Sequence, residues 1–115
     1  MVGKNTQHNL EAQCAREGTL TLSDIEEMSV AFKMLAEPIR LRIVLALMKG
    51  TLCVYDIAEA CDGSVSAVSH QLRVLKDNKI VKARRFGKNV EYSIADDHVQ
   101  KIVEMGIEHL QCAEG

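Results

Sequence analysis

Tryptophan is absent from this 115-residue sequence, and only two Phe and two Tyr are present. The hydrophobic core must therefore be built from Leu, Ile, Val, Ala and Met, and an aliphatic core of this kind favours helices. No apolar run approaches the ~18 residues that a membrane-spanning helix needs. The polar N-terminus is followed by no apolar segment of the kind found in secretion signals. We therefore expect a cytoplasmic protein with no membrane partner.

Cysteine is also scarce, with four widely spaced residues. This spacing excludes a disulfide-rich scaffold, and in a reducing compartment the cysteines should be free thiols, some of which could bind metal. The length allows one domain and leaves little room for a separate catalytic domain. We expect a loose N-terminal arm over residues 1–20 and one folded domain over residues 21–115.

The net charge of -2 argues against a nucleic-acid-binding protein, but the charge is unevenly distributed. Residues 64–91 contain seven Lys or Arg and two acidic residues, a local balance of +5. A basic stripe on an acidic body is typical of a surface that binds phosphates. A solvated charged face is the alternative, and charge alone does not separate the two.

Periodicity and capping residues predict five helices and one hairpin. The first helix should begin at Ser23 as N-cap and end at Glu37, because Glu37 precedes Pro38. Ser64 should cap the fourth helix, and Phe86 to Asn89 should form the hairpin tip. The other predicted elements are helices over residues 38–49, 54–60, 65–76 and 96–111, and strands over residues 80–85 and 90–94.

The short helix, the Asp62-Gly63 turn and the helix that follows form a helix-turn-helix pattern, and the hairpin can serve as a wing. The predicted fold is therefore mainly α with a β-hairpin wing, a winged helix-turn-helix. Polar side chains able to reach base edges lie on the second helix of the motif, and basic side chains continue into the wing. The predicted base-reading residues are Ser66, Ser69, His70 and Gln71, and the predicted phosphate contacts are Arg73, Lys76, Arg84, Arg85 and Lys88.

The last predicted helix has metal-binding residue types at both ends, namely Asp96, His98, His109 and Cys112. His98 and His109 are eleven residues apart, which places them about 20° apart around the helix axis but ~16 Å apart along it. One helix therefore cannot close the site. Two copies packed antiparallel across a twofold axis can, with Asp96 and His98 from one copy and His109 and Cys112 from the other. Incidental surface residues are the alternative interpretation.

The runs Leu52-Cys53-Val54-Tyr55-Asp56-Ile57-Ala58 and Ser66-Ala67-Val68-Ser69-His70-Gln71-Leu72-Arg73-Val74-Leu75 resemble the ArsR/SmtB metal-sensing repressors. The resemblance covers roughly residues 25–112. It implies a homodimer that binds operator double-stranded DNA and is released by metal. The zinc-sensing branch carries its ligands on the last helix, and Asp96, His98 and His109 match that pattern. Cys112 replaces its usual fourth ligand, so Zn(II) is the expected effector, while Cd(II), Co(II) and Ni(II) remain open.

The resemblance also implies a second, thiol-rich site on the third helix. Cys53 and Asp56 match it, Tyr55 stands where the family has a second cysteine, and Cys14 or His8 could reach over from the arm. Cys53 could instead be a small core residue, and Cys61 is interpreted as structural.

Two other functions remain open. A redox-sensing repressor would use the thiols of Cys53, Cys112 and Cys14, and a dimeric interaction module would have no DNA function. We do not expect an enzyme, because the Ser and His residues at positions 66, 69 and 70 share one short helix with no acidic partner and no oxyanion-binding turn.

Overall fold

The computed structural model describes residues 20–114 of the chain. The chain forms two compact units, residues 1–33 and residues 34–115, and each is treated by itself below. The predicted division into an arm over 1–20 and a domain over 21–115 stays a prediction. Cys14 and His8 lie outside the described residues.

Helix α2 (Leu22–Ala36) begins with a reciprocal cap. The Asp24 amide donates to Thr21 Oγ1 at 3.1 Å, and the Thr21 amide donates to Asp24 Oδ2 at 3.0 Å. This capping box satisfies two amides that a helix N-terminus leaves without partners. The prediction that Ser23 is the N-cap is therefore wrong, because the helix already begins at Leu22 and it is Thr21 that makes the capping hydrogen bonds. The helix ends at Ala36, since Glu37 is extended before Pro38.

Three helices form the centre of the second unit: α3 (Pro38–Leu47), α4 (Val54–Ala60) and α5 (Val65–Asp77). The predicted bounds of α4 are confirmed, whereas α3 ends two residues before the predicted Lys49. The completely or almost completely buried side chains of these helices are Ile43, Val44, Leu47, Ile57, Ala58, Val68, Leu72 and Leu75. The core is therefore aliphatic, as the scarcity of aromatic residues predicts.

The turn between α4 and α5 is formed by Asp62 and Gly63. Asp62 has the left-handed conformation (φ 54°), and the Gly63 amide donates to the carbonyl of Ala58 at 2.9 Å, which closes the end of α4. A Cβ on Gly63 would lie 3.4 Å from Val68 Cγ2. Gly63 thus lets the turn approach α5 closely. The left-handed backbone of Asp62 reverses the chain between α4 and α5.

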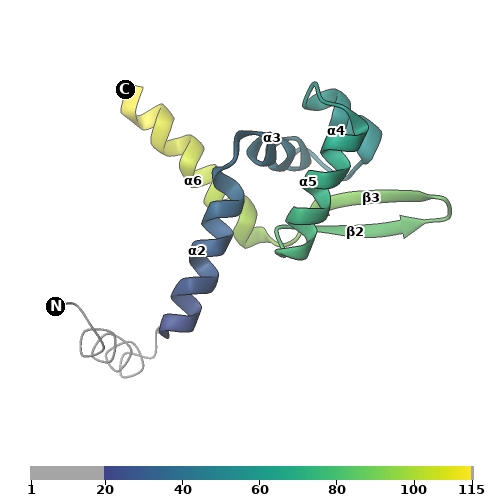
Figure 1. Cartoon of the computed structure of the whole chain (residues 1–115). Coiled ribbons are helices and arrows are strands. Elements are labelled where there is room, and N and C mark those ends of the chain that lie inside the picture. Colours follow the sequence, from purple (N-terminus) through teal and green to yellow (C-terminus); the bar gives the residue numbers. More distant parts are fainter. Residues whose placement is uncertain (1–19, 115) are drawn as a thin grey trace. The chain divides into compact units, whose positions relative to one another are not determined.

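The sheet has three strands, β1 (Leu52–Cys53), β2 (Val81–Phe86) and β3 (Asn89–Ile94), in the order β1-β3-β2. All pairings are antiparallel. β2 and β3 form the predicted hairpin, which projects beside α5 (Figure 1). Its tip is Gly87-Lys88, with Gly87 at φ 58°, a conformation that glycine adopts without strain. β1 was not predicted, since the segment after Gly50 was expected to be a link.

Helix α6 (Asp97–Glu114) follows the hairpin. The prediction placed Asp96 inside this helix, but Asp96 precedes it, and its side chain caps the first turn. Among the described residues, no helix combines the length and the apolar character needed to cross a membrane. The helix-turn-helix of α4 and α5 with a hairpin wing confirms the predicted fold class.

Candidate nucleic-acid interface and metal ligands

Helix α5 is capped as predicted and held to the core by one face. Ser64 is extended, and its Oγ accepts a hydrogen bond from the Ala67 amide at 3.1 Å. Val68, Leu72 and Leu75 are completely buried on the inner face. Their spacing of three and four residues fixes which side of the helix faces away from the core.

The outward side of α5 carries most of the predicted DNA-contacting residues. Ser66, His70 and Arg73 are exposed and stand four and three residues apart, so they share one face. Lys76 is also exposed near the end of the helix. A short polar residue, an imidazole and two cations therefore lie on a surface that could enter a major groove.

Ser69 and Gln71 are half-buried and lie toward the flanks of this surface. Ser69 lines a groove of about 520 Å³ between α4, α5 and the hairpin. Gln71 Oε1 accepts a hydrogen bond from Nε of Arg40, a residue of α3, at 2.9 Å. No sequence pattern predicted this contact between Gln71 and Arg40. The signal that could have found it is a cation inside the otherwise apolar α3 segment, because such a cation needs a polar partner on a neighbouring element.

The two adjacent arginines of the wing point to opposite faces of the hairpin, because successive side chains alternate along a strand. Arg84 pairs across the strands with Glu91, and Arg85 pairs with Val90. Val81 is on the same strand face as Arg85 and is only 2% exposed, so Arg85 is on the side of the wing that packs toward the helices, the α5 side. Arg85 and the hairpin-tip residue Lys88 are both exposed.

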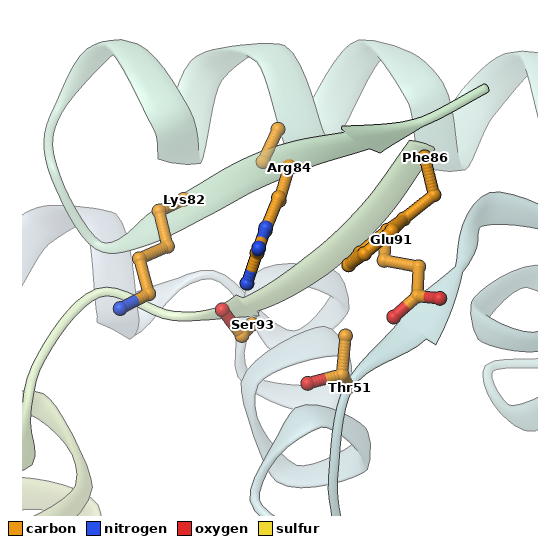
Figure 2. Close-up of a pocket in the computed structure, with 7 residues that line it drawn as sticks. Thr51, Lys82, Arg84, Phe86, Glu91 and Ser93 are labelled. Atoms are coloured by element: carbon orange, nitrogen blue, oxygen red, sulfur yellow. The ribbon is translucent and has the colours of Figure 1, made fainter. Parts of the chain in front are cut away.

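Arg84 lies on the other face of the wing, with Lys82 and Phe86 (Figure 2). The guanidinium carbon of Arg84 is 4.8 Å from the centroid of the Phe86 ring, which is a cation–π arrangement. These side chains line an open groove of about 480 Å³ together with Thr51, Glu91 and Ser93. The basic stripe of the sequence is therefore divided between two faces.

The predicted metal ligands are accessible, three of them on α6 and Asp96 immediately before it. The side chains of Asp96 and His98 are 54% and 85% exposed, and Oδ1 of Asp96 lies 3.6 Å from Nδ1 of His98. His109 and Cys112 are exposed near the other end of the helix. Within the described residues, no group of three His, Cys, Asp or Glu side chains could hold a metal ion. One copy of the chain therefore brings together only part of the predicted ligand set.

Cys53 and Asp56 lie together at the start of α4. The Cys53 thiol donates to Asp56 Oδ2 at 3.3 Å, and both residues line the groove that Ser69 also lines. These are two of the three residues of the predicted second site, and the third, Cys14, lies outside the described part of the chain.

Cys61 is only 3% exposed at the end of α4. Burial raises the pKa of its thiol, and the nearby Arg42 partly opposes that effect. A buried thiol that remains protonated is a packing residue, which agrees with the structural role predicted for Cys61.

Comparison with known proteins shows the same fold and family. The family described as "Bacterial regulatory protein, arsR family" matches residues 37–83. The chain is 47% identical over 92 residues to the "Transcriptional repressor SmtB homolog" of Synechocystis, covering 80% of this chain and 70% of that protein. It is 36% identical over 102 residues to the "HTH-type transcriptional regulator NmtR" of Mycobacterium tuberculosis, covering 89% and 85%. The AntR antimony-specific transcriptional repressor has a similar structure, with TM-score 0.74 and 41% identity over 82% of this chain and 86% of that one.

Proposed function

Because the chain belongs to the ArsR family of bacterial regulatory proteins, we propose that it is a metal-responsive repressor that binds operator DNA as a homodimer. Zn(II) binding is proposed to release the operator. The family makes it a DNA-binding transcriptional regulator, in agreement with the expectation that it is not an enzyme. The observation that supports metal sensing most directly is the pair of exposed metal-binding side chains, Asp96 and His98, at the start of α6.

The names of the relatives support a metal effector without fixing which metal it is. A Staphylococcus aureus relative, 39% identical over 84 residues and covering 72% of this chain and 69% of that protein, is a "Cadmium resistance transcriptional regulatory protein CadC homolog". The structural relative AntR is antimony-specific. Imidazole, carboxylate and thiolate ligands suit zinc, and a thiolate also suits softer ions. We therefore propose Zn(II) as effector, with Cd(II), Co(II) and Ni(II) as the ions to compare.

DNA binding is assigned to α5 and the wing. In this proposal Ser66, Ser69, His70 and Gln71 meet base edges, while Arg73, Lys76, Arg84, Arg85 and Lys88 meet phosphates. Exposure of Ser66, His70 and Arg73 on one face of a capped, core-anchored helix supports this assignment. Because each cation neutralises a phosphate and releases counterions, affinity should fall steeply with salt.

The donor pair at the start of α6 fits half of a zinc site. Two ligands of one tetrahedral zinc ion lie about 3.3 Å apart when each bond is ~2.0 Å, and the Asp96 and His98 atoms are 3.6 Å apart. We propose that His109 and Cys112 of a second copy complete the set, because ~16 Å of helix separates them from His98 within one copy.

The surface between the two ligand pairs supports the antiparallel packing of two α6 helices. Ile102 and Met105 stand four and seven residues after His98, on the same helix face, and are 43% and 63% exposed. Val99 and Val103, by contrast, are buried within one copy. Burial of Ile102 and Met105 against a second copy would hold the ligand pairs opposite each other. The solved structure of a possible ArsR-family regulator from Mycobacterium bovis, 30% identical with TM-score 0.70, is homodimeric; the match covers 78% of this chain and 87% of that one.

Release of DNA then follows from linkage. Metal ligation would fix the arrangement of the two α6 helices and, with it, the spacing of the two α5 helices. If that spacing no longer matches successive major grooves, metal weakens DNA binding. DNA weakens metal binding by the same factor.

A thiol-based switch at Cys53, Cys112 and Cys14 is the second candidate, favoured by the exposure of Cys112. Cys53 supports it less well, because its thiol already donates a hydrogen bond to the carboxylate of Asp56. Oxidant treatment of metal-free protein separates the two candidates.

The test of metal sensing is operator binding by fluorescence anisotropy at fixed salt, first with chelator and then with stoichiometric zinc. Zinc should weaken binding by the wild type at least ~10-fold, about 1.4 kcal/mol of coupling. His98→Ala should bind DNA equally well but ignore zinc. Asp97→Asn changes the neighbouring residue, which is not a proposed ligand, and should respond like the wild type. Unchanged wild-type affinity in zinc would refute zinc sensing, and unchanged affinity in Cd(II), Co(II) and Ni(II) as well would refute metal sensing.

A further inference from the structure

Arg40 of α3 holds the side chain of Gln71 on α5. Its Nε donates to Gln71 Oε1 at 2.9 Å, and this contact is partly buried. The Nη1 atom of the same guanidinium lies 3.6 Å from Sδ of Met34. The guanidinium is therefore anchored at two points, and it links α3 directly to the helix that carries the proposed base-reading residues.

The chemistry of arginine fixes the orientation of the Gln71 amide. A guanidinium has five N–H donors and no acceptor, so an amide that faces it must present its oxygen. The NH₂ group of Gln71 then points away from Arg40. Within residues 20–114, Gln71 Nε2 donates to no other group, and no buried side-chain polar atom lacks a partner. The NH₂ group is therefore not completely buried.

This orientation limits which base Gln71 can read. A free glutamine pairs with adenine through two bonds at once, donating to N7 and accepting from N6. The Arg40 guanidinium holds the oxygen of Gln71 toward α3, so the side of the amide turned away from α3 presents its two N–H donors. We propose that Arg40 is a positioning residue that makes Gln71 a donor-only reader, selecting an acceptor edge such as guanine O6 and N7 or thymine O4. The inference rests on the proposed DNA contact of α5 but not on the proposed metal site.

The test is selection of binding sites from a duplex library with a randomised core, in the presence of chelator. The wild type should select guanine or thymine at one position of each half-site, and Gln71→Ala should lose that preference. In Arg40→Leu the amide can rotate, and adenine should gain relative to guanine at that position on the order of 10-fold, the size of one base contact. Arg40→Leu combined with Gln71→Ala should select the same sequences as Gln71→Ala alone.

Arg42→Leu is the matched control. Arg42 lies on the same helix and carries the same charge, but its Nη1 donates to the carbonyl of Cys61 at 3.4 Å instead of to α5. It should select the wild-type base. Gln71→Glu provides a second measurement that does not depend on folding of the Arg40 variant. Its carboxylate can still pair with Arg40 but has no N–H donor, so the preference for an acceptor edge should vanish.

The proposal is overturned if Arg40→Leu selects the wild-type base, or if Gln71→Glu does. It is also overturned if Arg40→Leu alters the selection when Gln71 is already alanine, because Arg40 would then act by its own contact with DNA. Failure of the wild type to select any sequence would instead count against the proposed DNA contact of α5.

Discussion

Oδ1 of Asp96 accepts hydrogen bonds from the amides of His98 and Val99, at 2.9 and 3.1 Å, and also lies 3.6 Å from the imidazole Nδ1 of His98. One carboxylate therefore caps α6 and stands beside a proposed metal ligand. Capping satisfies the first amides of the helix and fixes the direction of the Asp96 side chain. The proposed ligand pair is thus ordered by the helix terminus itself.

The two roles of Asp96 can be separated by substitution. Asp96→Asn keeps a good N-cap but loses the charge, so its stability should stay close to that of the wild type while its zinc affinity falls. Asp96→Ala should lose both the cap and the charge. Its unfolding free energy should fall by about 1 kcal/mol, and its zinc affinity should fall as well. Urea denaturation in chelator and zinc titration measure the two effects. Wild-type zinc affinity in both variants would remove Asp96 from the ligand set.

The fold was largely predictable because its signals are local. Ser64 before an amphipathic segment, Pro38 at a helix start and alternating residues around Gly87 each determine structure over a few residues. β1 escaped prediction because two residues are too few to show alternation. The N-cap of α2 was missed because Thr21 and Ser23 are both good capping residues with an acidic residue three positions later, Asp24 and Glu26, and only the structure shows which pair forms the hydrogen bonds.

The candidate site was less predictable because its geometry is not local. The sequence identified residue types on α5, but the contact between Arg40 and Gln71 joins residues 31 positions apart. Likewise, adjacent arginines in a sequence look equivalent, and only the strand register places Arg84 and Arg85 on different faces. The predicted metal ligands lie on or immediately before α6 and are accessible, and a site assembled from two copies cannot be tested within one.

The two wing arginines should differ in their effect on DNA binding. Arg85 lies on the α5 side of the wing, so Arg85→Ala should weaken DNA binding and reduce the slope of log affinity against log salt by about 1. Arg84 stacks on Phe86 on the other face, so its contact with phosphate should be weaker and Arg84→Ala should reduce the slope less than Arg85→Ala does. Both variants lose the same charge, so each controls for the other. Equal slopes in the two variants would show that the face of the wing on which an arginine lies does not determine how strongly it contacts phosphate.

The buried thiol of Cys61 should make stability depend on alkaline pH. Burial raises the pKa of Cys61, so the folded chain holds this proton more tightly than the unfolded chain does. The contribution is complete below the ordinary thiol pKa of about 8.5 and is lost as the pH rises toward the folded value. Denaturation at pH 7.5 and pH 9.5, under reducing conditions, should show a larger loss of stability in the wild type than in Cys61→Ala. A parallel loss in both would mean that Cys61 ionises equally in the two states.

Mixed dimers test the sharing of ligands between copies. The homodimers of His98→Ala and of His109→Ala each lack one ligand at both proposed sites. In a heterodimer of the two variants, one site lacks both histidines. The other has Asp96 and His98 from one copy and His109 and Cys112 from its partner, and is complete.

The heterodimer should therefore bind one zinc ion with wild-type affinity, while both homodimers bind weakly. Two differently tagged copies, co-expressed and purified through both tags, provide the material, and a competition titration with a chromophoric chelator counts the ions.

The double variant His98→Ala with His109→Ala, paired with a wild-type copy, is the control with matched composition. Each of its two sites lacks one histidine, because the intact copy contributes only one half of each. Equal zinc binding by the two heterodimers would contradict antiparallel sharing, since they contain the same four histidine positions and differ only in how these are distributed between the copies.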